Sequence, residues 1–175
     1  MLTPTLETDR LIIRRYKESD IDALYEIITD KRLSKFITFP ETTYEEELDY
    51  IKTCIIISDT SNRERWAIEL KETNDVVGMI EITHIFKQHN YCDVGYTIRY
   101  KYWGNGYAAE ALKIVSDYFL NERKFHLVEC SCNELNIQSS RVMIKAGFKK
   151  DGYVPDRRLN EDGTYSGVEY YSKRK

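Results

Sequence analysis

Long apolar runs and a strong excess of charge of either sign are both missing from this 175-residue sequence. No stretch approaches the ~20 consecutive apolar residues that cross a membrane, and the segment MLTPTLETDRL carries acids where a signal peptide needs basic residues. Because 26 basic and 29 acidic side chains leave a net charge of -3, nothing attracts nucleic acid or an anionic membrane in general. We expect a cytoplasmic protein that binds neither.

Metal-ligand spacing is missing as well. The four cysteines form no C-x-x-C pattern, and the three histidines are scattered along the chain. We expect reduced thiols and no metal site. Cys130 and Cys132 share one face of an expected strand, where packing is the commoner role for such residues.

Repeats, low-complexity segments and Pro/Gly/Ser-rich linkers are not found either. A hydrophobic share of 42%, with 13% aromatic residues, is typical of a folded domain of ordinary size. We therefore expect residues 1–175 to form one domain, present as a monomer or a homodimer.

Alternating and helical apolar periods predict the order β-α-α-β-β-β-α-β-α-β-β. The first strand is expected over residues 10–16, followed by a helix capped by Ser19 and a second helix capped by Thr42 or Thr43. Two hairpin strands (65–70 and 76–86) and a third strand (91–100) precede a glycine loop. This is an α+β domain with a mixed, mostly antiparallel sheet and about four helices.

The segment KYWGNGYAAEA places two glycines between a strand and a helix. Gly104 and Gly106 let the backbone approach a ligand closely, and the helix N-terminus favours an anion such as a pyrophosphate. The spacing matches neither a P-loop nor a dinucleotide-binding fingerprint. On this feature alone, a tight turn without a ligand is an equal alternative.

A second strand and helix follow in HLVECSCNELNIQSSRVMIKAGF. Asn136 is a good helix cap, Gly147 is suited to end the helix in a left-handed conformation, and Phe148 is apolar enough for the core. Ser139, one turn into the helix, can reach a ligand lying between the two strand-loop-helix units.

These segments, together with ETDRLIIRRY, VVGMIEI and DVGYTIRY, resemble the GCN5-related N-acetyltransferase (GNAT) superfamily over nearly the whole chain, and within it the ribosomal-protein N-terminal acetyltransferase branch. The resemblance implies a sheet with a splayed strand pair, acetyl-CoA as cosubstrate and a primary amine as acceptor. It implies that Tyr96, Thr97 and Ile98 bind pantetheine, with Asn136 close by. The pyrophosphate would lie on Trp103, Gly104, Asn105, Gly106, Tyr107 and Ala108.

The same resemblance implies that Ser139 protonates the departing thiolate, since Met143 occupies the position where many members carry a tyrosine. Counting from Phe148, Arg158 occupies the position of the glutamate that ribosomal-protein enzymes use as base, which argues against the same protein substrate. Glu81 and Asp93 remain candidate bases, and solvated strand carboxylates are the alternative for each. No cysteine has a nucleophile setting, so direct transfer in a ternary complex is favoured.

Three functions remain open: acetylation of a protein N-terminal α-amine, acetylation of a small amine such as a polyamine, amino acid or antibiotic, and CoA binding without catalysis. Residues 36–44 and 156–164 are expected to wall the acceptor site.

Overall fold

The computed structural model of the chain describes residues 3–37, 39, 41–57, 64–160 and 162–175. Within them, eight strands form one sheet in the order β1-β2-β3-β4-β5-β6-β8-β7. Every neighbouring pair is antiparallel except β5 and β6, which are parallel. The expected mixed, mostly antiparallel sheet is confirmed.

Apart from three short 3-10 helices (η1, η2 and η3), the elements follow the expected order with two additions. The first part of the chain contains β1 (Leu6–Glu7), β2 (Leu11–Arg14), η1 (Glu18–Asp20), α1 (Ile21–Thr29), α2 (Lys31–Ser34), α3 (Tyr44–Ile57), β3 (Glu64–Leu70) and β4 (Val76–Phe86). The rest contains η2 (Lys87–His89), β5 (Tyr91–Ile98), η3 (Tyr100–Tyr102), α4 (Tyr107–Asn121), β6 (Leu127–Asn133), α5 (Ile137–Lys145), β7 (Lys149–Leu159) and β8 (Tyr165–Arg174). The additions, β1 and α2, are each too short to show a period in the sequence.

The caps of the first two long helices differ in outcome. Ser19 was expected to cap a helix, and this is wrong: it lies inside η1, because the Asp20 carboxylate accepts the Lys17 amide at 2.8 Å and turns the chain there. Thr43 does cap α3. Its hydroxyl accepts the Glu46 amide at 3.2 Å, and the Glu46 carboxylate accepts the Thr43 amide at 2.8 Å.

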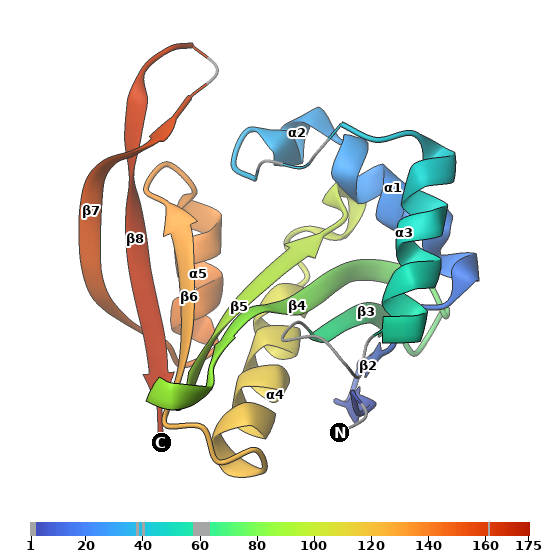
Figure 1. Cartoon of the computed structure of the whole chain (residues 1–175), viewed down its shortest axis with the longest axis horizontal. Coiled ribbons are helices and arrows are strands. Elements are labelled where there is room, and N and C mark those ends of the chain that lie inside the picture. The colour runs from blue at the N-terminus through green and yellow to red at the C-terminus, as the bar shows by residue number, and fades with distance from the viewer. Residues whose placement is uncertain (1–2, 38, 40, 58–63, 161) are drawn as a thin grey trace.

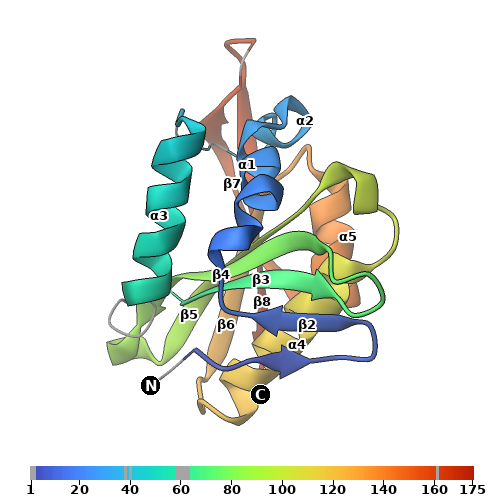
Figure 2. The ribbon, with the colours of Figure 1, turned by 90° about the vertical axis from the view of Figure 1, so that its right-hand side faces the viewer.

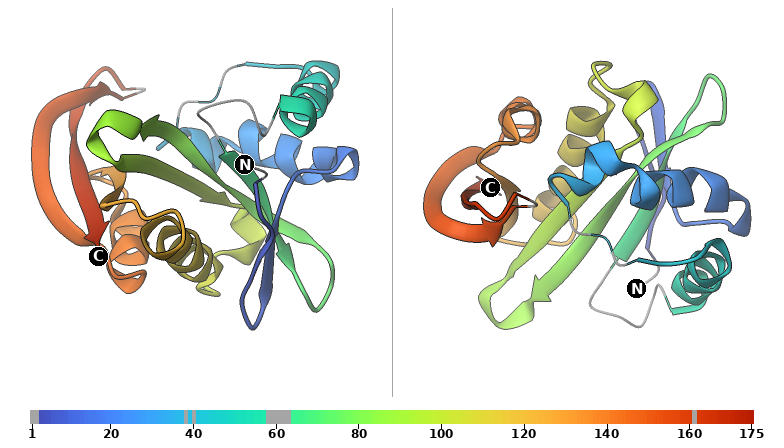
Figure 3. Two further views of the ribbon diagram at one scale, coloured as in Figure 1. Left: turned by 60° about the horizontal axis from the view of Figure 1, so that its bottom comes forward. Right: turned by 90° about the horizontal axis from the view of Figure 1, so that it is seen from above.

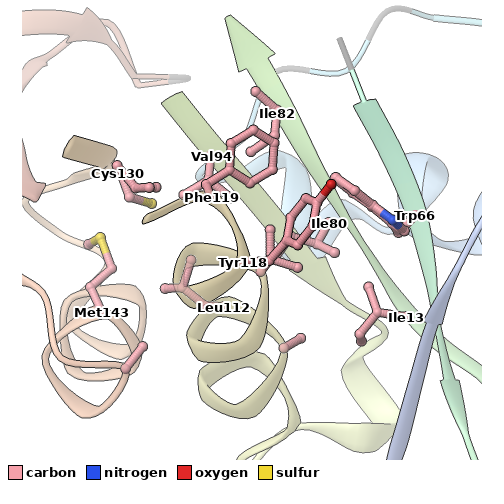
Figure 4. Close-up of a cluster of buried hydrophobic side chains, with 14 of the residues drawn as sticks. Ile13, Trp66, Ile80, Ile82, Val94, Leu112, Tyr118, Phe119, Cys130 and Met143 are labelled. Carbon is pink, nitrogen blue, oxygen red and sulfur yellow. The ribbon is translucent and has the colours of Figure 1, made fainter. Parts of the chain in front are cut away.

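Helices cover both faces of the sheet, with α4 and α5 on one face and α1 and α3 on the other (Figures 1 and 2). The larger core lies under α4 and α5 and contains Trp66, Phe119 and Met143, all fully buried (Figure 4). The smaller core lies under α1 and α3 and includes Leu24 and Ile51. Seen along two further directions, β7 and β8 curl away at one edge of the sheet (Figure 3).

Candidate active site

The strands β5 and β6 separate along the chain. They pair only through residues 91–93 and 127–129, whereas β6 pairs with β8 over its whole length. Figure 1 shows the two strands diverging from that end. The edge of β5 that carries Tyr96, Thr97 and Ile98 is therefore left without a strand partner on the β6 side, as the expected splay requires.

The glycine loop links this open edge to α4. Gly104 and Gly106 have φ values of +83° and +80°, a conformation that glycine adopts without strain. The Asn105 side chain donates to the carbonyls of Tyr102 (3.0 Å) and Trp103 (3.2 Å), which holds the loop shut on itself. Gly106 stands at the N-terminus of α4, so the first amides of the helix face the loop opening.

Trp103 differs from the rest of the predicted cradle. Its amide donates to the Tyr100 carbonyl at 3.1 Å, so it is already used, and its indole nitrogen donates to the Ile98 carbonyl at 2.7 Å. The ring packs against both cores. Trp103 thus anchors the loop to the end of β5, and an anion would be left to the amides from Gly104 to Ala108.

Two cations flank the loop, and the sequence analysis assigned neither a role. A Cβ atom at Gly106 would lie 3.3 Å from Lys145 Nζ and 3.7 Å from Arg10 Nη2. The Glu110 carboxylate accepts from Arg10 Nε at 2.8 Å, and Arg10 Nη1 donates to the Asn105 carbonyl at 3.0 Å. Lys145 has no carboxylate partner among the described residues. Arg10 therefore supports the loop, whereas Lys145 offers a charge to whatever binds there.

Ser139 lies opposite the open edge of β5. Its Oγ is 2.8 Å from the hydroxyl of Tyr96, which also donates to the Ser139 carbonyl at 3.1 Å. The helix cap is made instead by Asn136, whose Oδ1 accepts the Ser139 amide at 3.1 Å. The serine hydroxyl is therefore not a cap, and it is joined to a second hydroxyl that burial keeps neutral by raising the pKa of Tyr96.

Met143 is fully buried in the larger core, so no polar group comes from that position of α5. Tyr96 brings a phenol to the same region from β5. Sequence reasoning missed this pair because the two hydroxyls come from residues 43 positions apart.

The two predicted bases lie in different places. Glu81, on β4, lines a cavity between the splayed strands, which is described below, and its Oε2 is 3.2 Å from Arg65 Nε. Asp93 is not among the lining residues that the structure describes. It pairs in register with Glu129 where β5 and β6 still run together, and burial raises the pKa of both carboxyls. His84 Nδ1 lies 3.9 Å from Asp93 Oδ2.

The cavity has a volume of about 630 Å³ and runs between the splayed strands. Its described lining joins the predicted residues Tyr96 to Ile98, Trp103, Gly104, Gly106 to Ala108, Asn136, Ser139 and Glu81. Of the two segments expected to wall the acceptor end, Phe36, Ile37 and Phe39 line it. In the other segment Arg158 is not among the described lining residues, and from β7 its guanidinium donates to the Phe36 carbonyl.

All four cysteines are free and buried, as expected. Cys130 and Cys132 also line the cavity, and burial raises the pKa of the Cys132 thiol to about 11, which leaves it protonated at neutral pH. In the described residues, no group of three or more potential ligands is arranged for a metal. None of the described helices is long and apolar enough to cross a membrane.

The sequence profile of the acetyltransferase (GNAT) domain matches residues 10–149, and this chain belongs to that family of N-acetyltransferases. It is 30% identical over 166 residues to an uncharacterized N-acetyltransferase, YnaD, of Bacillus subtilis, covering 95% of this chain and 94% of that protein.

Solved structures share the fold. A GNAT-family acetyltransferase from Bacillus anthracis is 25% identical, with a TM-score of 0.84 and 98% of each chain covered. The ribosomal-protein α-N-acetyltransferase RimL, solved in complex with coenzyme A, superposes with a TM-score of 0.85 at 18% identity, again over 98% of each chain. RimL therefore shares the fold, and a ribosomal-protein-serine acetyltransferase of Escherichia coli, 21% identical over 178 residues, is a sequence relative from the same branch, so the resemblance to that branch is confirmed.

Proposed function

We propose that this N-acetyltransferase moves the acetyl group of acetyl-CoA to a primary amine by direct attack in a ternary complex. One observation carries the proposal: a single cavity joins a glycine loop at a helix N-terminus, an unpaired strand edge, a hydroxyl pair and a carboxylate. Those are the parts that a thioester donor and an amine acceptor need if they are to meet.

The donor would lie along the splay. The loop amides from Gly104 to Ala108 suit the pyrophosphate because they stand at a helix N-terminus, with Lys145 alongside. The unpaired edge of β5 offers backbone groups to the amides of pantetheine, in the manner of an added strand. RimL, which shares this fold over 98% of each chain, was solved with coenzyme A, and this supports coenzyme A as the kind of ligand that the fold takes.

The chemistry begins with the acceptor. At neutral pH a primary amine is mostly protonated, whether it is an α-amine with a pKa of about 8 or an alkylamine with a pKa near ten, so Glu81 takes a proton from the ammonium group before attack. The nitrogen lone pair then forms the C–N bond, and an amide on the β5 edge stabilises the oxyanion. As the C–S bond breaks, the thiolate takes a proton from Ser139, and water carries the nitrogen's second proton back to the serine. The products are an amide, the CoA thiol and the proton released from the ammonium group.

Two kinds of acceptor fit this scheme. The likeness to RimL favours a protein N-terminal α-amine. Arg158 stands where those enzymes are expected to carry a glutamate, and its guanidinium contacts a backbone carbonyl, so the same ribosomal substrate is disfavoured. A small amine is the other candidate, and CoA binding without catalysis is the alternative to both.

Thiol release in the presence of acetyl-CoA and a panel of amines and peptides tests the proposal. Millimolar acetyl-CoA should raise the melting temperature, because it binds the folded state. Acetyl-CoA binding without amine-dependent thiol release would instead show a non-catalytic module.

Glu81→Gln should lower kcat roughly a hundredfold or more, in the range of losing a general base. Asp93→Asn is the matched control, since it makes the same change at the other predicted base, a strand carboxyl that is half-buried like Glu81. If Asp93→Asn were the slow variant and Glu81→Gln were not, the base assignment would be wrong.

A further inference from the structure

The acceptor end of the cavity is apolar, and this bears on the proposed function by narrowing its substrate. Five apolar side chains line that end. Met79 comes from β4, and the other four come from α2 and the loop after it: Leu33, Phe36, Ile37 and Phe39. Leu33 is buried, whereas Phe36, Ile37 and Phe39 are partly exposed toward the opening. Contact with an apolar group would remove that surface from water.

Negative charge is scarce on the same wall. Glu81 is the one carboxylate among the described lining residues. Its charge is partly balanced by Arg65, whose side chain is 11% exposed and lies 3.2 Å away. The lining cations Arg141 and Lys145 belong to α5, on the side of the glycine loop. A polyamine would bring further ammonium groups that find no carboxylate partner here, and an unpaired buried charge is costly.

The spacing of the carboxylate and the apolar wall limits the size of the acceptor. Met79 and Glu81 are two residues apart on β4, so their side chains share one face of the sheet about 6.6 Å apart along the strand. An amine whose nitrogen meets Glu81 would therefore place a substituent a few bonds away against Met79, and Ile37 lines the same cavity.

We propose that the acceptor is a primary amine with a single positive charge and an apolar group within a few bonds of the nitrogen. An α-amine of an apolar amino-acid residue has this chemistry, whether it belongs to a small amide or to a peptide. The inference rests on the proposed amine acetylation and goes beyond it by excluding polyamines and strongly polar amines.

Thiol release with matched acceptors tests it. Leucinamide and phenylalaninamide should show kcat/KM about ten- to a hundredfold above glycinamide, which carries the same charge without the side chain. Lysinamide and spermidine should fall at least tenfold below leucinamide. A Leu-Gly-Gly peptide compared with leucinamide distinguishes a peptide end from a small amine.

Ile37→Ala should narrow the leucinamide-to-glycinamide ratio about three- to tenfold, because it removes part of the apolar wall. Ile56→Ala is the matched control, since Ile56 is 77% exposed on α3 and does not line the cavity. It should leave the ratio unchanged.

Preference for spermidine or lysinamide, or equal ratios in wild type and Ile37→Ala, would overturn the inference and leave amine acetylation standing. No thiol release with any of these acceptors, from protein that still binds acetyl-CoA, would overturn the proposed function and this inference with it.

Discussion

Replacing Ser139 with alanine removes one hydroxyl, whose possible roles in capping the helix, in stability and in catalysis can be told apart from its contacts. The hydroxyl lies 2.8 Å from that of Tyr96, while Asn136 caps the helix through the Ser139 amide. The substitution leaves that cap intact. It also leaves Tyr96 its second partner, the Ser139 carbonyl at 3.1 Å. The substitution therefore neither removes the helix cap nor leaves the Tyr96 hydroxyl without a hydrogen-bond partner.

The stability cost should be small. One neutral hydrogen bond contributes about 0.5–1.5 kcal/mol, and alanine has a good helix propensity, so the free energy of unfolding should fall by about 1 kcal/mol or less. The rate should fall further. Losing a modest general acid slows turnover roughly ten- to a thousandfold, or about 1.4–4 kcal/mol of barrier. A thiolate leaves readily by itself, so the effect should be near the lower end.

The assay is single-turnover thiol release, where the chemical step limits, together with the dissociation constant of acetyl-CoA. Ser140→Ala is the matched control: it makes the same change one residue on, where the hydroxyl donates to the Ile137 carbonyl at 2.9 Å and does not line the cavity. An unchanged rate in Ser139→Ala would remove this serine from the mechanism. A loss of acetyl-CoA affinity without a loss of rate would make it a binding residue.

Three further predictions concern the loop and α3. Gly106→Ala and Gly163→Ala both place a Cβ at a φ near +80°, so both should lose about 1–2 kcal/mol of stability; only the Gly106 variant should weaken acetyl-CoA binding, by tenfold or more in calorimetry. Lys145→Gln should weaken the same binding about three- to tenfold and flatten its salt dependence, and unchanged affinity would contradict its placement beside the phosphates. Burial raises the pKa of Glu47 from 4.5 to about 6. Ionisation of this carboxyl therefore destabilises the fold increasingly between pH 4.5 and pH 6, and fully above pH 6. Glu47→Gln should therefore gain about 1 kcal/mol at pH 8 after allowance for partial exposure, and chemical unfolding should show the gain vanish by pH 4.5.

Most of the fold could be predicted because its signals are local. The strand before the glycine loop, the helix after it and the cap at Asn136 each depend on residues within a few positions of one another. The positive φ of Gly106 and Gly147 follows the same rule, since a turn or helix end of this kind requires it. The elements β1 and α2 were not predicted, because two and four residues are too few for a period to repeat.

The acceptor wall could be predicted only in part. The segment from Phe36 was expected there and three of its side chains line the cavity, but no described residue of the segment around Arg158 lines it. Which of two loops is nearer a cavity depends on the curl of β7 and β8, and that curl follows from bulges at residues 150–152 and 154–158. Gly152 and Pro155 lie at those bulges, but neither residue specifies how far the two strands curl.

The choice between Glu81 and Asp93 shows why strand position alone cannot identify a base. Both carboxylates lie on the same face of neighbouring strands, and periodicity treats them alike. They differ because β6 pairs with β5 beside Asp93 and departs from it further along, so Glu81 faces an opening and Asp93 faces Glu129. The two carboxylates are thus distinguished by the point at which the parallel pairing of β5 with β6 ends, after Asp93 and Glu129.

The surroundings of Ser139, the proposed proton donor, likewise depend on residues that are distant in the sequence. Related sequences should therefore be compared at Met143 and Tyr96 together. A buried methionine occupies the helix position where a tyrosine would be expected, yet a phenol is still present, because Tyr96 reaches Ser139 from the adjoining strand. A hydroxyl pair of this kind is defined by a place in space between β5 and α5. Substitution at Met143 and at Tyr96 should therefore be considered together: a tyrosine in the helix and one in the strand would compete for the same volume beside the serine. A relative that gains the first is expected to carry a smaller or apolar residue at the second.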